Sequence, residues 1–117
     1  MAFDPIDFYR QASAWYEDKA DDAEPRMRSI VSRAYYSAFL VAREQAKIKN
    51  SSEGTHKLTA EYYKTNAGSS RIGNRLDDLR LRRNSADYDL RDTCGRRKAG
   101  EALAYAKKIL NDLNAPA

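Results

Sequence analysis

Apolar residues recur every three or four positions along most of this chain, which is the spacing of one face of an α-helix. The first such stretch follows Asp4 and Pro5, a capping residue and a proline suited to the first helical turn. It predicts a helix from about Pro5 to Asp21. The strongest pattern follows Pro25 and predicts a second helix from Arg26 to Lys49.

The second predicted helix is apolar on so much of its circumference that we expect it at the centre of the fold. Its main apolar face consists of Met27, Ile30, Val31, Ala34, Tyr35, Ala38, Val41 and Ala42. Tyr36, Phe39 and Leu40 widen that face.

Three further segments have helical spacing. Thr55 is a candidate cap for a third helix from about His56 to Thr65, in which Leu58, Tyr62 and Tyr63 are expected to face inward. A fourth helix is predicted to begin at position 69 or 70 and to fray near positions 85–86.

The last apolar pattern predicts a fifth helix, capped by Asp92 or Thr93. Its apolar positions are Ala99, Ala102, Leu103, Ala106, Ile109, Leu110 and Leu113. No part of the sequence alternates apolar and polar residues with the period of two that marks a strand. We therefore predict an all-α protein, an antiparallel bundle of four to five helices, folded as a single domain over residues 1–117.

Composition narrows the class of protein further. With 42% apolar and 32% charged residues, the chain is typical of a folded domain rather than of a disordered tail. No apolar run approaches the roughly 18 residues of a membrane span, and no basic-then-apolar leader opens the sequence, so we expect a cytoplasmic protein with no membrane partner. One cysteine, Cys94, excludes an internal disulfide, and one histidine, His56, argues against a zinc site, so we expect no metal and no cofactor.

Positive charge is concentrated in one segment. From Arg71 to Lys98 there are nine basic and five acidic residues, and the difference equals the net charge of +4 of the whole chain. On the predicted fourth helix, Ile72, Leu76 and Leu79 form one apolar stripe, and Arg83 occupies its next position. A guanidinium in place of a core residue needs a partner, because a stranded charge costs several kcal/mol.

The other arginines of this helix flank the stripe and are expected to be solvated. Arg71, Arg75 and Arg82 lie to one side of it, and Arg80 lies to the other. A basic segment of this kind is suited to an anionic partner such as RNA or a nucleotide, whose binding should weaken as salt rises.

Three segments together resemble the HEPN superfamily (higher eukaryotes and prokaryotes nucleotide-binding domain), in its small standalone prokaryotic branch. They are Ser32-Arg33-Ala34-Tyr35-Tyr36-Ser37-Ala38-Phe39, the lone His56, and Leu81-Arg82-Arg83-Asn84-Ser85-Ala86-Asp87-Tyr88. The resemblance covers the chain from about Phe8 to Leu113. It implies an all-helical bundle that forms a homodimer, with the arginine motifs of both copies in one cleft. It also implies a toxin–antitoxin or phage-defence setting, with a separately encoded nucleotidyltransferase as partner.

Many members of that superfamily are metal-independent endoribonucleases with a motif of Arg, a polar residue and a His, in which four to six residues separate the Arg from the His. The His moves a proton while the Arg stabilises charge on the phosphate attacked by the ribose 2′-hydroxyl. Arg83 and Asn84 match the first two elements, but Tyr88, Asp89 and Leu90 occupy the window of the His. A tyrosine phenol, with an ordinary pKa of about 10, is a poor base at neutral pH.

Three hypotheses follow for this segment. In the first, the domain binds RNA or nucleotide phosphates in a dimer cleft, through Arg75, Arg80, Arg82, Arg83 and Asp87. In the second, it is an endoribonuclease whose catalytic residues are Arg83, Asn84 and Tyr88. In the third, the bundle only self-associates, and Arg83 forms a helical ion pair with Asp87.

The remaining candidates have ordinary structural alternatives. Tyr88 could be a core tyrosine with its hydroxyl bonded, and Cys94 is expected to be inert. His56 could serve as a distant proton donor, although a residue that caps or packs at the start of the third helix is the simpler interpretation.

Overall fold

The computed structural model describes residues 3–49 and 54–116. Within these ranges the chain forms five α-helices and no strand, which confirms the all-α prediction. The helices are α1 (Ile6–Glu17), α2 (Glu24–Gln45), α3 (Thr55–Thr65), α4 (Ser70–Tyr88) and α5 (Arg96–Asp112). No helix of the described part is long and apolar enough to cross a membrane.

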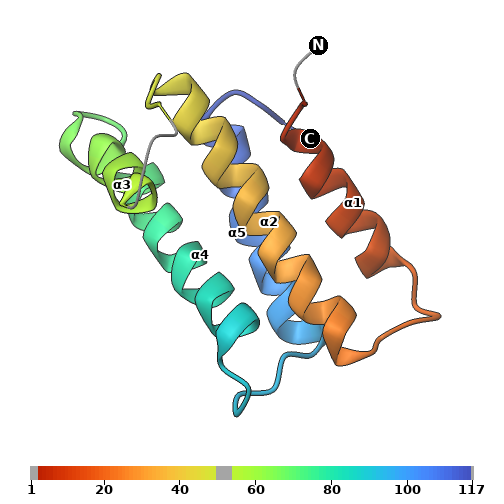
Figure 1. Cartoon of the computed structure of the whole chain (residues 1–117). Helices are drawn as coiled ribbons and strands as arrows, with labels where there is room; N and C mark the ends of the chain where they lie inside the picture. The colour runs from red at the N-terminus through yellow and green to blue at the C-terminus, as the bar shows by residue number, and fades with distance from the viewer. Residues whose placement is uncertain (1–2, 50–53, 117) are drawn as a thin grey trace.

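Helix α2 is the centre of the bundle, as predicted. It contacts each of the other four helices. Figure 1 shows α1 on one side of α2, with α3 and α4 on the other side and α5 behind it. Helices α1 and α4 run antiparallel to α2, as expected of a bundle in which short connections join successive helices.

The core forms where the apolar faces of α2 and α5 meet. All eight positions predicted for the main face of α2 are buried, and so are all seven predicted for α5. Ala34, Ala38, Ala102 and Ala106 are fully buried, and such small side chains let helix backbones approach closely. Helical periodicity therefore identified the largest part of the core.

The inward face of α3 differs from the prediction. Tyr63 is buried, but Leu58 and Tyr62 are 58% and 44% exposed. The buried face instead consists of small or hydroxyl-bearing residues, among them Thr59, whose Oγ1 donates to the carbonyl of Thr55. A threonine hydroxyl bonded in this way can be buried at little cost.

Close packing between α3 and α4 explains this choice of face. A Cβ atom added to Gly73 of α4 would lie 2.6 Å from the carbonyl oxygen of Ala60 in α3. At that separation no large side chain fits between the two helices. Leu58 and Tyr62 therefore lie outside the contact, whereas Tyr63 reaches α2 and donates from its hydroxyl to the carbonyl of Ala42.

Several helix ends also differ from the prediction. Helix α1 ends at Glu17 rather than Asp21, and the carboxylates of Asp18 and Asp21 accept hydrogen bonds from Ala20 N and Ala23 N. Aspartates that bond nearby backbone groups in this way compete with helix formation. Helix α2 ends at Gln45 rather than Lys49.

The start of α3, the end of α4 and the start of α5 can also be compared with the prediction. Thr55 is the first residue of α3, and Gly54 precedes it in the left-handed conformation (φ 86°). Helix α4 continues to Tyr88. Helix α5 begins at Arg96, and Asp92 forms an ion pair with Lys98 (2.7 Å) instead of capping it.

Candidate functional site

Arg83 lies in the contact between α2 and α4, where its side chain is only 14% exposed. Its Nη2 donates to the hydroxyl of Tyr36 (2.8 Å), and its Nη1 donates to Oδ1 of Asn84 (3.2 Å). Its Nε lies 2.8 Å from Oδ2 of Asp87, at ion-pair distance, although the N–H does not form a hydrogen bond there. The prediction that a guanidinium on the apolar stripe needs a partner is confirmed.

Aromatic rings surround the same guanidinium. Its Cζ lies 6.0 Å from the ring centre of Tyr35, 5.0 Å from that of Tyr36 and 5.5 Å from that of Tyr88. Cations at these distances are attracted to the faces of aromatic rings. Tyr35 is buried, and burial raises the pKa of its phenol, so this hydroxyl remains protonated at neutral pH.

Tyr88 is not a core residue. It is 70% exposed, and its hydroxyl forms no hydrogen bond with residues 3–49 or 54–116. The alternative of a buried, bonded tyrosine is therefore wrong. The ring stands beside Arg83 at the surface, where a ligand can reach it.

His56 belongs to this group of residues, although it precedes Arg83 on a different helix. Its Nδ1 shares a hydrogen bond with the hydroxyl of Tyr35 (2.5 Å), and its ring stacks on Phe39 with the ring centres 4.2 Å apart. Burial lowers the pKa of His56, and the charges of Arg80 and Arg83 lower it further. The imidazole is therefore neutral at pH 7, and it packs at the start of α3 as the simpler interpretation predicted.

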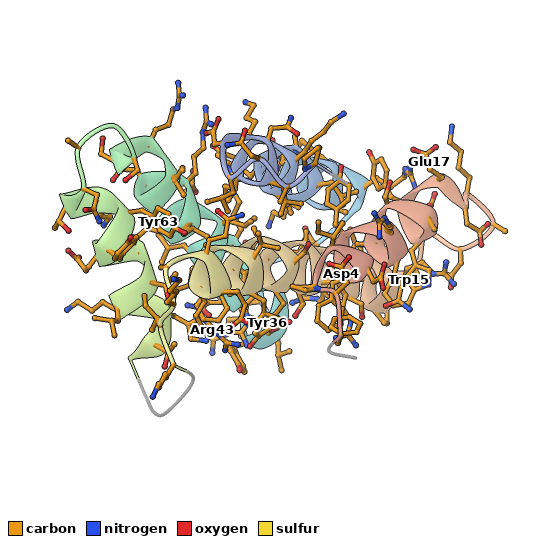
Figure 2. All side chains as sticks on the ribbon, turned by 90° about the horizontal axis from the view of Figure 1, so that it is seen from above. Asp4, Trp15, Glu17, Tyr36, Arg43 and Tyr63 are labelled. Carbon is orange, nitrogen blue, oxygen red and sulfur yellow. The ribbon has the colours of Figure 1, made fainter. Side chains whose placement is uncertain are left out.

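We call these residues the arginine–tyrosine cluster. Its members are Tyr35, Tyr36, His56, Arg80, Arg83 and Tyr88. Arg43 extends it along α2, because its guanidinium lies 5.9 Å from the ring centre of Phe39, on which His56 stacks. Figure 2 shows Tyr36 and Arg43 projecting from the same side of α2. The sequence had not singled out Arg43, although its spacing of seven residues from Tyr36 was a usable signal.

The five residues predicted to bind RNA are divided between two faces of α4. Arg75 forms an ion pair with Asp112 (2.8 Å), and Arg82 forms one with Glu101 (3.0 Å) and stacks on Tyr105. Both therefore pack against α5, and the expectation that they are solvated is wrong. Arg80, Arg83 and Asp87 lie on the other side of α4.

Arg80 differs from its neighbours because it has no carboxylate. It forms no ion pair or hydrogen bond with any residue in the described part of the chain. Its charge nevertheless acts on both Tyr35 and His56: it opposes the rise that burial causes in the pKa of Tyr35, and it lowers the pKa of His56, so Arg80 lies near both. An unpaired guanidinium next to a partnered one is a favourable arrangement for an anion.

Asp87 connects the cluster to α2. Its Oδ2 pairs with Arg83 and also accepts a hydrogen bond from Ser32 Oγ (3.3 Å). The helical ion pair expected under the structural hypothesis is therefore present. Arg83 therefore contributes to the α2–α4 contact, whether or not it also binds a ligand.

Arg28 is the residue that sequence reasoning missed entirely. Its guanidinium donates to the carbonyls of Ala86 (2.9 Å) and Asp89 (3.1 Å), and it pairs with Glu24 (2.7 Å). It thereby fixes the end of α4, the segment that carries the cluster, to the first turns of α2. No local pattern reveals such a contact, because its partners lie 58 and 61 residues away. Cys94 nearby is free and buried, and burial raises the pKa of its thiol, which favours the unreactive protonated form.

Comparison with known proteins identifies a relative in an archaeon. The chain is 32% identical over 107 residues to an uncharacterized protein of Methanocaldococcus jannaschii, and the match covers 75% of this chain and 64% of that protein. The chain thus spans less than two thirds of the length of the curated relative that it matches. No family model matches the chain, and no solved structure matches it. The name of the archaeal relative assigns no function.

Proposed function

We propose that this chain is a HEPN-like domain that binds the phosphates of RNA or of a nucleotide at the arginine–tyrosine cluster. One observation carries the proposal: Arg83 is oriented in the α2–α4 contact by Tyr36, while Arg80 beside it has no carboxylate within the described residues. A fixed guanidinium and a free one suit the several oxygens of a phosphate. Exposed Tyr88 adds a ring on which a base can stack.

Binding is tested with a fluorescently labelled single-stranded RNA, by anisotropy, at salt concentrations from about 50 to about 300 mM. Arg80→Ala should weaken binding and reduce the salt dependence by about 0.7 in log–log slope for each phosphate that Arg80 neutralises. Arg75→Ala and Arg82→Ala are matched controls, since both arginines are neutralised on the α5 side of the same helix. An equal decrease of affinity in all three variants, or a flat salt response, would contradict the proposal.

Arg83→Ala needs a separate measurement because of its place in the α2–α4 contact. If its role is purely structural, the variant should unfold at a much lower temperature and bind RNA normally once folded. If it also binds phosphate, the folded variant should bind RNA more weakly. Thermal denaturation followed by titration at a temperature well below the midpoint distinguishes the two.

A homodimer is the second element of the proposal. Three exposed apolar residues near the end of α4 support it, namely Leu81 (69% exposed), Tyr88 (70%) and Leu90 (86%). A second copy that covers this surface would bring two arginine–tyrosine clusters together in one cleft. Light scattering at several concentrations measures the mass, and a monomer that persists at high concentration would exclude the dimer.

The resemblance to the HEPN superfamily supports a partner as well. We propose a toxin–antitoxin or phage-defence role in which a separately encoded nucleotidyltransferase controls this chain. Expression of the chain alone should then arrest growth, and co-expression of the nucleotidyltransferase should relieve the arrest. A chain that never affects growth would argue against the toxin role.

His56 favours a second candidate function, metal-independent RNA cleavage. Its Nδ1 shares a hydrogen bond with Tyr35, whereas its Nε2 has no partner in the described structure; in the tautomer whose Nδ1–H donates to Tyr35, Nε2 can accept a proton. In this reaction the 2′-oxygen attacks phosphorus as its proton passes to a base, and the 5′-oxygen leaves with a proton. The products are a 2′,3′-cyclic phosphate and a 5′-hydroxyl end.

Cleavage of a mixed-sequence RNA in EDTA, from pH 6 to pH 9, tests this second function. Arg83→Ala, Tyr88→Phe and His56→Gln separate the candidate groups. A histidine base with a lowered pKa predicts a rate that is already constant near neutral pH, whereas a tyrosine base predicts a rate that climbs toward alkaline pH. No cleavage by any form would leave phosphate binding as the function.

A further inference from the structure

A second polar feature adjoins the arginine–tyrosine cluster. A cavity of about 380 Å³ opens between the start of α2 and the end of α4. It is lined by Arg28, Ser29, Ser32 and Arg33 from α2, and by Ala86 and Asp87 from α4. Sites of this volume accommodate ligands of the size of a nucleoside.

Asp87 is the group that joins the cavity to the cluster. Its Oδ2 contacts both Arg83 and Ser32, but its Oδ1 has no partner among the residues that the structure describes. An ionised carboxylate only accepts hydrogen bonds. The free oxygen of Asp87 therefore favours a ligand group that donates, and a phosphate is disfavoured at that point of the cavity.

Two cations are available near Asp87. Arg83 pairs with its carboxylate, and Arg80 lies on the same helix, three residues before Arg83. Arg33 lines the same cavity as Asp87; its guanidinium lies 5.1 Å from the ring centre of Phe8 and has no carboxylate within the described ranges. The guanidinium of Arg28 is already engaged by Glu24 and by backbone carbonyls. Asp87 thus has one cation in direct contact and shares its cavity with a second.

An RNA backbone likewise places each ribose between two phosphates. We propose that the cavity is a ribose subsite, in which Asp87 accepts a hydrogen bond from the 2′-hydroxyl of an RNA whose flanking phosphates lie at Arg83 and Arg33. The inference rests on the proposed phosphate binding and adds the class of nucleic acid to it. Because DNA lacks the 2′-hydroxyl, the site selects RNA over DNA.

The test compares three labelled oligonucleotides of one sequence: RNA, DNA and 2′-fluoro RNA, which keeps the sugar shape of RNA but cannot donate from the 2′ position. The wild-type protein should bind RNA about 10-fold more tightly than the other two, as one charge-assisted hydrogen bond predicts. A denaturing gel establishes that the RNA is intact after the titration. This comparison needs no variant, so it does not depend on the folding of a mutant.

Asp87→Ala should abolish the preference for RNA while binding of DNA stays equal or becomes tighter, because the change also removes a negative charge beside the phosphates. Asp78→Ala is the matched control, since Asp78 pairs with Arg82 on the α5 side of the same helix. It should leave the preference intact.

Each outcome has a definite meaning. Equal affinity for the three oligonucleotides would overturn the ribose subsite and leave phosphate binding standing. A preference for RNA that survives in Asp87→Ala would also overturn it, because another group would then read the sugar. No binding of any oligonucleotide would contradict the proposed function and the subsite together.

Discussion

Replacing Arg28 with alanine tests whether one side chain of α2 holds the end of α4 in place. Its guanidinium donates to the carbonyls of Ala86 (2.9 Å), Asp89 (3.1 Å) and Asp92. The last carbonyls of a helix have no partner inside that helix, and α4 has no basic residue in its own last turn. Arg28 therefore caps α4 from a different helix.

The expected cost follows from three short hydrogen bonds. A hydrogen bond to a charged group contributes roughly 1.5–3 kcal/mol, but water can replace the guanidinium at carbonyls near the surface, so we take about 1 kcal/mol for each. Arg28→Ala should then lower the free energy of unfolding by about 3 kcal/mol, which for a chain of this length lowers the Tm by about 12 °C.

Thermal denaturation followed by circular dichroism measures the change. Arg97→Ala is the matched control, because Arg97 is 75% exposed and, among residues 3–49 and 54–116, pairs with Glu101 of its own helix alone. It should lower the Tm by about 2 °C or less. Arg28→Lys keeps the charge near the end of α4 but cannot bond several carbonyls at once, so its Tm should fall between the two. If Arg28→Ala melts within about 3 °C of Arg97→Ala, the reasoning is refuted.

Three further changes test the packing and the electrostatics. Gly73→Ala should destabilise the protein by about 1–2 kcal/mol although alanine favours helices, because the new Cβ would meet the backbone of α3. In the same chemical denaturation series Gly100→Ala should be tolerated, because its Cβ would meet the hydroxyl end of the Tyr16 side chain. Tyr63→Phe should cost about 1 kcal/mol, because it removes the hydrogen bond to the carbonyl of Ala42 and leaves that carbonyl only the bond from Ala46 N. Tyr62→Phe, at an exposed position, should not change the unfolding midpoint. The pKa of His56 is lowered in the folded state, so the unfolded chain takes up its proton first, and the free energy of unfolding should fall as the pH drops below about 6.5. His56→Gln should flatten this part of the curve of stability against pH. An unchanged curve would show that another group is responsible.

The long helices were predictable because their signal is local. The apolar faces of α2 and α5 repeat every three or four residues, and all of their predicted main positions are buried. Helix α3 was predicted less well. Its inward face depends on how closely it approaches Gly73 of α4, and a glycine on a distant helix leaves no trace in the pattern of α3 itself.

The candidate site also has features that the local sequence predicted and features that depend on residues far away in the chain. The position of Arg83 on an apolar stripe required a partner, and the sequence was sufficient to say so. The identity of that partner, the hydroxyl of Tyr36, depends on the register between α2 and α4. His56 had been treated as distant, because three-dimensional proximity to Arg80 and Arg83 is not encoded in its neighbours along the chain.

The arginines of α4 show what each level decided. Helical geometry alone placed Arg75 and Arg82 on one side of the stripe and Arg80 on the other, since the angle between residues of a helix is fixed by its pitch. Only the tertiary structure decided that α5, with Asp112 and Glu101, covers and neutralises the first side. The charge of Arg80 stays unpaired because no carboxylate of the described chain pairs with it. Which arginines of α4 are paired therefore depends on the contacts between helices and not on the helices themselves.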